Sequence, residues 1–157
     1  WAEGWRPRLA VEFDRASGDR PGGNYGRFDT LYGMRRAELG PAGLYNAIGR
    51  ANILAPGVRL ELTPGRRADA FLGYKGLFLA SATDAFSTTG VRDATGASGR
   101  FAGHQFEMRL RTWLVPETLR FETSFVNVFH GGFLKSAPNG PTDGETQYVS
   151  LNLSAFF

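Results

Sequence analysis

The sequence HQFEMRLRTWLVPETLRFETSFVNVFH, residues 104–130, decides the fold. Two runs of alternating apolar and polar side chains are separated in it by a short turn at residues 115–118. One set of alternate positions holds Phe106, Met108, Leu110, Thr112, Leu114, Leu119, Phe121, Thr123 and Phe125, and the other holds Glu107, Arg109, Arg111, Trp113, Arg120, Glu122 and Ser124. A period of two over about nine or more residues is typical of a β-strand whose two faces meet different solvents. The stretch therefore predicts a hairpin with one charged face and one apolar face.

Two kinds of protein contain such strands. In a soluble barrel or sandwich the apolar face packs inward and the charged face meets water, whereas in a transmembrane barrel the apolar face meets lipid and the charged face lines an aqueous lumen. Alternation alone does not distinguish them, so the lengths of the connections and the C-terminus must decide.

Composition excludes several classes of protein. The 157 residues suffice for one domain or for part of a larger one, and the start at Trp1 without an export-signal pattern suggests a fragment or a mature C-terminal piece. The absence of cysteine excludes a disulfide scaffold, a thiolate metal site and a cysteine nucleophile. The eighteen basic and fifteen acidic residues are interleaved, with a net charge of +3, whereas a nucleic-acid-binding surface would be more densely basic. No apolar run approaches the roughly 18 residues of a membrane helix, so a closed barrel is the membrane-spanning option that is left.

Six alternating segments are expected along the chain. They are residues 8–14, 52–63 and 70–80, the two arms of the 104–130 stretch, and residues 146–157. The connections alternate between long and short: 15–51, 64–67, 81–103, 115–118 and 131–145. Both short turns then lie at one end of the sheet and all three long loops at the other, an asymmetry typical of transmembrane barrels. We therefore predict an all-β, antiparallel up-and-down transmembrane β-barrel of six to eight strands, in which residues 1–157 are a single barrel domain or the C-terminal segment of a larger barrel.

Several short motifs resemble one protein family. They are Phe13-Asp14 with Ala16-Ser17-Gly18-Asp19, Phe28-Asp29-Thr30-Leu31-Tyr32-Gly33, Pro56-Gly57-Val58-Arg59-Leu60-Glu61-Leu62-Thr63-Pro64, Tyr74 with Leu79-Ala80, Gly103-His104-Gln105, and Gly132-Phe133-Leu134-Lys135. In order and spacing they resemble the C-terminal portion of the alginate export family. The resemblance implies an outer-membrane barrel of a Gram-negative bacterium that passes an anionic polysaccharide to the exterior. Family barrels have several times six strands, and six cannot enclose such a channel, so the resemblance also implies that much of the wall lies outside this chain.

The terminal Phe157, preceded by an apolar set of alternate residues, resembles the signal by which the barrel-insertion machinery recognises outer-membrane proteins. The alternative is an apolar strand that happens to end in phenylalanine.

The less apolar face is expected to line the substrate path. It carries Arg8, Arg59, Lys75, Arg109, Arg111 and Arg120 with Glu12, Glu61, Glu107 and Glu122, six cations against four anions. Guanidinium groups suit a polyuronate because their planar fork pairs with carboxylates through two parallel bonds. Arg109, Arg111, Arg120 and Glu122 are the strongest candidates for contact. The alternative is that cross-strand pairs of arginine and glutamate only satisfy one another.

Other candidate residues are weaker. Trp113 and Tyr148 are either sugar-stacking surfaces or packing aromatics. His104 and His130 are expected to form hydrogen bonds rather than a zinc site, and the loop aspartates are expected to be solvated, with a calcium site as the alternative; these are Asp14, Asp19, Asp29, Asp93 and Asp143. The sequence indicates no catalytic group, no metal site and no cofactor.

The predicted function is an outer-membrane pore or export barrel for an anionic, alginate-like polysaccharide or another anionic solute. The expected partners are membrane lipid, that solute and, through Phe157, the insertion machinery, but no nucleic acid. Three alternatives remain: an eight-stranded anchor or adhesin with two more strands within 15–51, a soluble ligand-binding barrel, and an outer-membrane enzyme, for which no catalytic group is found. In the soluble barrel, the internal pocket would be lined by Leu60, Leu110, Phe121 and Phe125.

Overall fold

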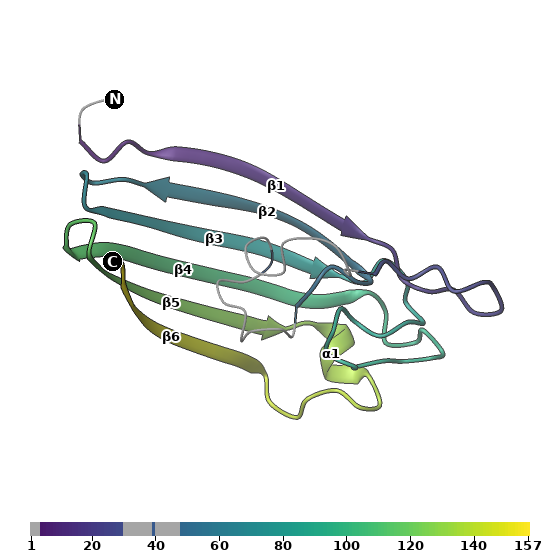
Figure 1. Cartoon of the computed structure of the whole chain (residues 1–157). Helices are drawn as coiled ribbons and strands as arrows, with labels where there is room; N and C mark the ends of the chain where they lie inside the picture. Colours follow the sequence, from purple (N-terminus) through teal and green to yellow (C-terminus); the bar gives the residue numbers. More distant parts are fainter. Residues whose placement is uncertain (1–3, 30–38, 40–47) are drawn as a thin grey trace.

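Six antiparallel strands form one sheet in chain order (Figure 1). The structure is a computed structural model that describes residues 4–29, 39 and 48–157. The strands are β1 (Arg8–Ala16), β2 (Ile53–Leu62), β3 (Ala68–Phe78), β4 (Phe101–Val115), β5 (Leu119–His130) and β6 (Glu145–Ala155), and a short helix, α1 (Gly132–Ser136), precedes β6. Each strand pairs with the next one in the chain, which confirms the predicted all-β, antiparallel up-and-down order.

The connections are sorted by length between the two ends of the sheet. Residues 63–67 and 116–118 make the short turns at one end, and the C-terminus lies at this same end (Figure 1). The described parts of the three long connections, 17–29 with 48–52, 79–100 and 131–144, lie at the opposite end (Figure 1). This is the asymmetry that the sequence predicts.

The element boundaries differ from the expected ones mainly at the long-loop end. β4 begins at Phe101, because Phe101 and Gly103 pair with Phe78 and Leu77 of β3. Helix α1 was not predicted, since its five residues lie in a stretch rich in glycine and proline. Residues 30–38 and 40–47, which are part of the 15–51 stretch considered for two further strands, lie outside the described residues.

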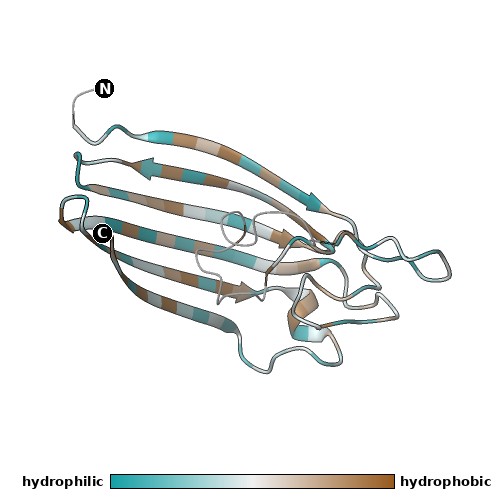
Figure 2. Ribbon diagram, in the orientation of Figure 1, coloured by the Kyte–Doolittle hydropathy of each residue, from teal (hydrophilic) through white to brown (hydrophobic). Residues whose placement is uncertain are grey.

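The two faces of the sheet differ in chemistry and in exposure. We call the face that carries Glu12, Arg59, Lys75, Glu107 and Arg111 the charged face and its opposite the apolar face; the cross-strand register places these five side chains together. Alternating polar and apolar bands run along the strands in Figure 2. The apolar face is the exposed one and includes Leu9, Val11, Phe13, Val58, Leu72, Met108, Leu110, Val149, Leu151 and Leu153.

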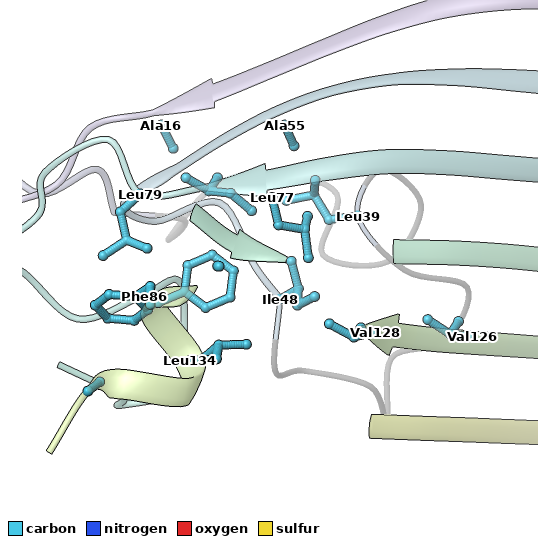
Figure 3. Close-up of a cluster of buried hydrophobic side chains, with 14 residues drawn as sticks. Ala16, Leu39, Ile48, Ala55, Leu77, Leu79, Phe86, Val126, Val128 and Leu134 are labelled. Atoms are coloured by element: carbon cyan, nitrogen blue, oxygen red, sulfur yellow. The ribbon is translucent and has the colours of Figure 1, made fainter. Parts of the chain in front are cut away.

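The hydrophobic core lies at the long-loop end of the charged face. Leu77, two residues after Lys75, and Val126, the cross-strand partner of Glu107, are fully buried there. Phe86 from the 79–100 loop and Phe133 and Leu134 from α1 complete the cluster (Figure 3). The long loops therefore pack against the charged face, and the apolar face receives no covering layer from the described residues.

Asn52 connects the first two long loops. Its Nδ2 lies 3.0–3.2 Å from the carbonyl oxygens of Ser81, Asp84 and Ala85, and its Oδ1 accepts the backbone N–H of Ser81 at 2.6 Å. Asn52 adopts a φ of 44°, a left-handed conformation that asparagine tolerates well. The adjacent Gly18 leaves the necessary room, because a Cβ atom there would lie 2.1 Å from the Asn52 Oδ1.

Two buried aspartates fix the 79–100 loop. Burial raises the pKa of Asp84, but hydrogen bonds from the backbone N–H groups of Asp19 and Ala85 and from the Arg27 guanidinium bring its pKa below the ordinary value. Asp93 accepts hydrogen bonds from the hydroxyl and backbone groups of Thr95 and Ser98, and these hold the pKa of Asp93 well below its usual range. Both carboxylates are therefore stabilised in the ionised form.

The sheet is open at its two edges. β1 and β6 each pair with a single neighbour in the described structure, and no pairing joins them to each other. Closure into a barrel, which the sequence predicts, is thus not observed in this chain. No helix among the described residues has the length and apolar character needed to cross a membrane.

Candidate functional site: the charged face

An arginine–phenylalanine–arginine stack occupies the middle of the charged face. The guanidinium carbons of Arg59 and Arg109 lie 4.5 and 4.6 Å from the ring centroid of Phe71. Phe71 is buried and stands on β3 between the two arginines of β2 and β4. Because cations are attracted to the face of an aromatic ring, Phe71 fixes both guanidinium groups in place.

Lys75 is the most deeply buried charge on this face, with 3% of its surface exposed. Its Nζ lies 3.0 Å from Glu12 Oε2 and 3.4 Å from Asp14 Oδ2, so its charge is compensated by β1 across the intervening strand. The lysine crosses β2 at Gly57, where an added Cβ would lie 2.6 Å from Lys75 Cγ. Gly57 therefore allows the lysine to lie flat against the sheet.

Asp69 holds two arginines nearer the short-turn end. Its Oδ1 accepts a hydrogen bond from Arg109 Nη2 at 3.2 Å, and its Oδ2 accepts one from Arg111 Nε at 2.9 Å. All three groups are about one-third exposed. Arg109 and Arg111, two of the three arginines favoured as substrate contacts, are thus already engaged by a carboxylate, although each retains further N–H donors.

The remaining predicted path residues have varied surroundings. Arg8 pairs with Glu61 at 2.8 Å on the outer strands, and Arg59 lies 3.2 Å from Glu12. Glu107 is buried beside this cluster at 4% exposure. Among the described residues no ion pair within 4 Å is found for Glu107, Arg120 or Glu122; the Arg120 guanidinium instead lies over Trp113 and Phe156.

The charge on the strands of this face is balanced. The six cations expected from the sequence are all present, but Asp14 and Asp69 share the face with Glu12, Glu61, Glu107 and Glu122, which gives six anions. The predicted positive bias is therefore absent from the strand residues. The sequence predicts strands that end at 14 and begin at 70, whereas β1 continues to Ala16 and β3 begins at Ala68, so Asp14 and Asp69 both lie within strands.

A comparison with protein families identifies the chain. The family model described as alginate export matches residues 1–145. The chain belongs to the alginate export family. The resemblance noted from the motifs is confirmed, and no curated protein and no solved structure gives a significant match. Membership supports an export role and a place in the outer membrane of Gram-negative bacteria; the family is an export family and not an enzyme family.

The aromatic and histidine candidates have packing and hydrogen-bonding partners in the structure. Trp113 packs against Phe156 with ring centroids 5.3 Å apart, and Tyr148 packs against the hydrophobic core, which is the packing role considered for it. His104 Nδ1 lies 2.7 Å from the Tyr74 hydroxyl. The two ring nitrogens of His130 lie 2.6 Å from the Asp143 carbonyl and 2.8 Å from the Thr146 hydroxyl. Both histidines therefore have hydrogen-bonding partners, as expected.

The loop aspartates do not converge. Asp19 accepts the backbone N–H of Gly26, Asp93 closes its own loop, and Asp14 pairs with Lys75 on the sheet. Among the residues that the structure describes, no three acidic or histidine side chains are placed to hold a metal ion. The structure thus gives no support to the calcium alternative.

Proposed function

We propose that these six strands are part of the wall of an outer-membrane β-barrel and that the charged face lines an aqueous path for an anionic solute, such as an alginate-like polysaccharide. The observation that carries this proposal is the inverted exposure of the sheet. Val11 on the apolar face is 83% exposed, whereas Lys75 and Glu107 on the charged face are 3% and 4% exposed. A sheet that presents leucine, valine and phenylalanine outward along every strand suits contact with lipid.

The alternative of a soluble ligand-binding barrel fits this arrangement poorly. It requires the apolar side chains to line an internal pocket, but Leu110 is 42% exposed and lies with Leu60, Phe121 and Phe125 on the uncovered face. The long loops and α1 cover the opposite, charged face instead.

The ion pairs of the charged face suit passage rather than tight capture. Arg59, Arg109 and Arg111 each have a carboxylate neighbour, so a passing carboxylate competes for them. A transport path must bind weakly enough to release its cargo. Arginines held by acidic neighbours and by Phe71 offer such exchangeable contacts.

Single-cysteine accessibility tests the orientation of the sheet. Cysteines are placed at Leu110, Phe121 and Leu151 on the apolar face, and separately at Arg109, Glu122 and Ser150 on the charged face. The protein is then treated in bilayers with a charged, water-soluble thiol reagent, with no competing thiol from this chain. We expect the charged-face set to react and the apolar-face set to be protected. Rapid reaction of the apolar set, or purification without detergent as a monomer, would overturn the proposal.

Anion passage tests the function itself. Replacing Arg109 and Arg111 together by glutamine should reduce the permeability ratio of anions to cations in planar bilayers. Replacing Arg20 and Lys135, two exposed cations of the long-loop end, removes the same charge and serves as the matched control. An unchanged permeability ratio in the Arg109/Arg111 variant would contradict an ion path along the charged face.

A further inference from the structure

A basic pocket of about 190 Å³ lies where the charged face reaches the short-turn end of the sheet. Its lining includes Arg66 and Arg67 from the β2–β3 turn, Asp69 from β3, Arg111 and Trp113 from β4, and Arg120 from β5. The pocket therefore brings together side chains from residues 63–69, 111–113 and 120, which are far apart in the chain. It adjoins the stack around Phe71 through Asp69, which binds Arg109, and was not expected from the sequence.

The pocket concentrates the positive charge of the chain. Four arginines and one aspartate give a formal charge of 4 − 1 = +3, which equals the net charge of all 157 residues. Asp69 is already bound by Arg109 and Arg111. Among the described residues no ion pair is found for Arg66, Arg67 or Arg120, so three guanidinium groups at this one place have donors that are open to an anion.

The aromatic ring of Trp113 lines the pocket together with these arginines. The backbone N–H of Trp113 donates to the Arg67 carbonyl at 2.8 Å, which ties the turn to β4. The Arg120 guanidinium lies 5.6 Å from the Trp113 ring centroid and 5.1 Å from that of Phe156. The attraction between a cation and an aromatic face restrains the guanidinium beside Trp113. A carboxylate and an apolar ring face can thus be received side by side.

We propose that this pocket is a docking site for one carboxylate-bearing sugar unit, at the short-turn mouth of the path. Arg66, Arg67 and Arg120 take the carboxylate, and Trp113 takes the apolar face of the sugar ring. The volume is below the roughly 300–1,000 Å³ of pockets for drug-sized ligands, which suits a single sugar unit. This inference rests on the proposed function in one respect: only if the charged face lines a path does the short-turn end become the place where a polymer meets it.

Three small probes separate the contributions of charge and ring. Glucuronate carries both features, acetate only the carboxylate and glucose only the ring. The full-length protein, labelled with 5-fluorotryptophan and held in detergent micelles, is titrated with each probe while the fluorine resonance of Trp113 is followed; the Trp113→Phe variant assigns that resonance. We expect the Trp113 signal to shift with glucuronate at concentrations about tenfold lower than with acetate or glucose. Glucose lacks the charge-assisted hydrogen bonds of the carboxylate, and acetate lacks the contact of a sugar ring with Trp113.

The variant Arg66→Gln/Arg67→Gln tests the pocket with little risk to folding, because both side chains are exposed on a turn. It should weaken the glucuronate response about tenfold and leave the glucose response unchanged, while the control Arg20→Gln/Lys135→Gln retains the wild-type response to both. Equal weakening in both variants would show only long-range attraction and would overturn the proposal. A glucuronate response no stronger than that of glucose would overturn it as well.

The same preparation separates this inference from the proposed function. If anions pass through bilayers but glucuronate does not shift the Trp113 resonance, the docking site fails and the transport path stands. If glucuronate binds and no anion passes, the transport path fails and the docking site stands.

Discussion

The carboxamide of Asn52 connects two long loops through hydrogen bonds to Ser81, Asp84 and Ala85, and no pattern in the sequence predicts this role. Replacing Asn52 by alanine leaves the Ser81 backbone N–H and several buried carbonyls without their partner, at a cost of about 2–4 kcal/mol in the free energy of unfolding. The midpoint of urea unfolding in detergent measures this change. The exposed Asn24→Ala variant is the control and should be near wild type. A midpoint for Asn52→Ala equal to that of the control would show that the loops do not depend on this side chain.

The pH dependence of the 79–100 loop follows from its two aspartates. The pKa values of Asp84 and Asp93 are lower in the folded protein than in the unfolded chain. The stability they contribute is therefore fully present above the unfolded pKa of about 4 and is lost as the pH falls through the lower folded values. Amide hydrogen exchange in residues 79–100, corrected for the intrinsic pH dependence, should accelerate below about pH 4. The double variant Asp84→Asn/Asp93→Asn should exchange rapidly at neutral pH and lose this dependence; a retained dependence would assign it to other groups.

Among the elements, the strands were predictable and the loop cluster was not. Alternation in residues such as Phe106 to Leu114 is a local property, so the strands, their order and the sorting of the loops could be derived from sequence. The register could not, and it is the register that brings Asp69 to Arg111 and places Phe71 between Arg59 and Arg109. The basic pocket depends on the same information, because Arg66 and Arg120 meet only when β3, β4 and β5 are aligned. The contacts of Asn52 have no periodic signal at all.

The two phenylalanines that follow β6 are expected to have different roles, Phe156 in packing and Phe157 in recognition. Phe156 packs on Trp113, whereas Phe157 is fully exposed. Phe157→Ala should therefore leave the unfolding midpoint of the refolded protein unchanged but lower the amount of protein inserted in the outer membrane several-fold, if Phe157 is the insertion signal. Quantification of membrane-inserted protein in cells, beside refolding in detergent, measures both. Normal insertion of the variant would leave Phe157 as a simple chain end.

At the scale of the whole molecule, the two open edges are the main constraint. An unpaired strand edge does not persist in lipid, because each unsatisfied backbone group there costs several kcal/mol. In the full-length protein in bilayers, the outward-directed amides of β1 and β6 should therefore exchange hydrogen as slowly as those of β3 and β4. Exchange that is much faster at both edges would contradict a closed barrel that contains these strands.

The path of Lys75 across Gly57 has a consequence for how a long polymer would travel. The lysine lies along the sheet, as it must to reach β1, and occupies the space where other residues have a Cβ atom. If the charged face lines the path, the ammonium group of Lys75 would not project into it. A polymer drawn lengthwise over this part of the wall would pass the lysine without that side chain having to move.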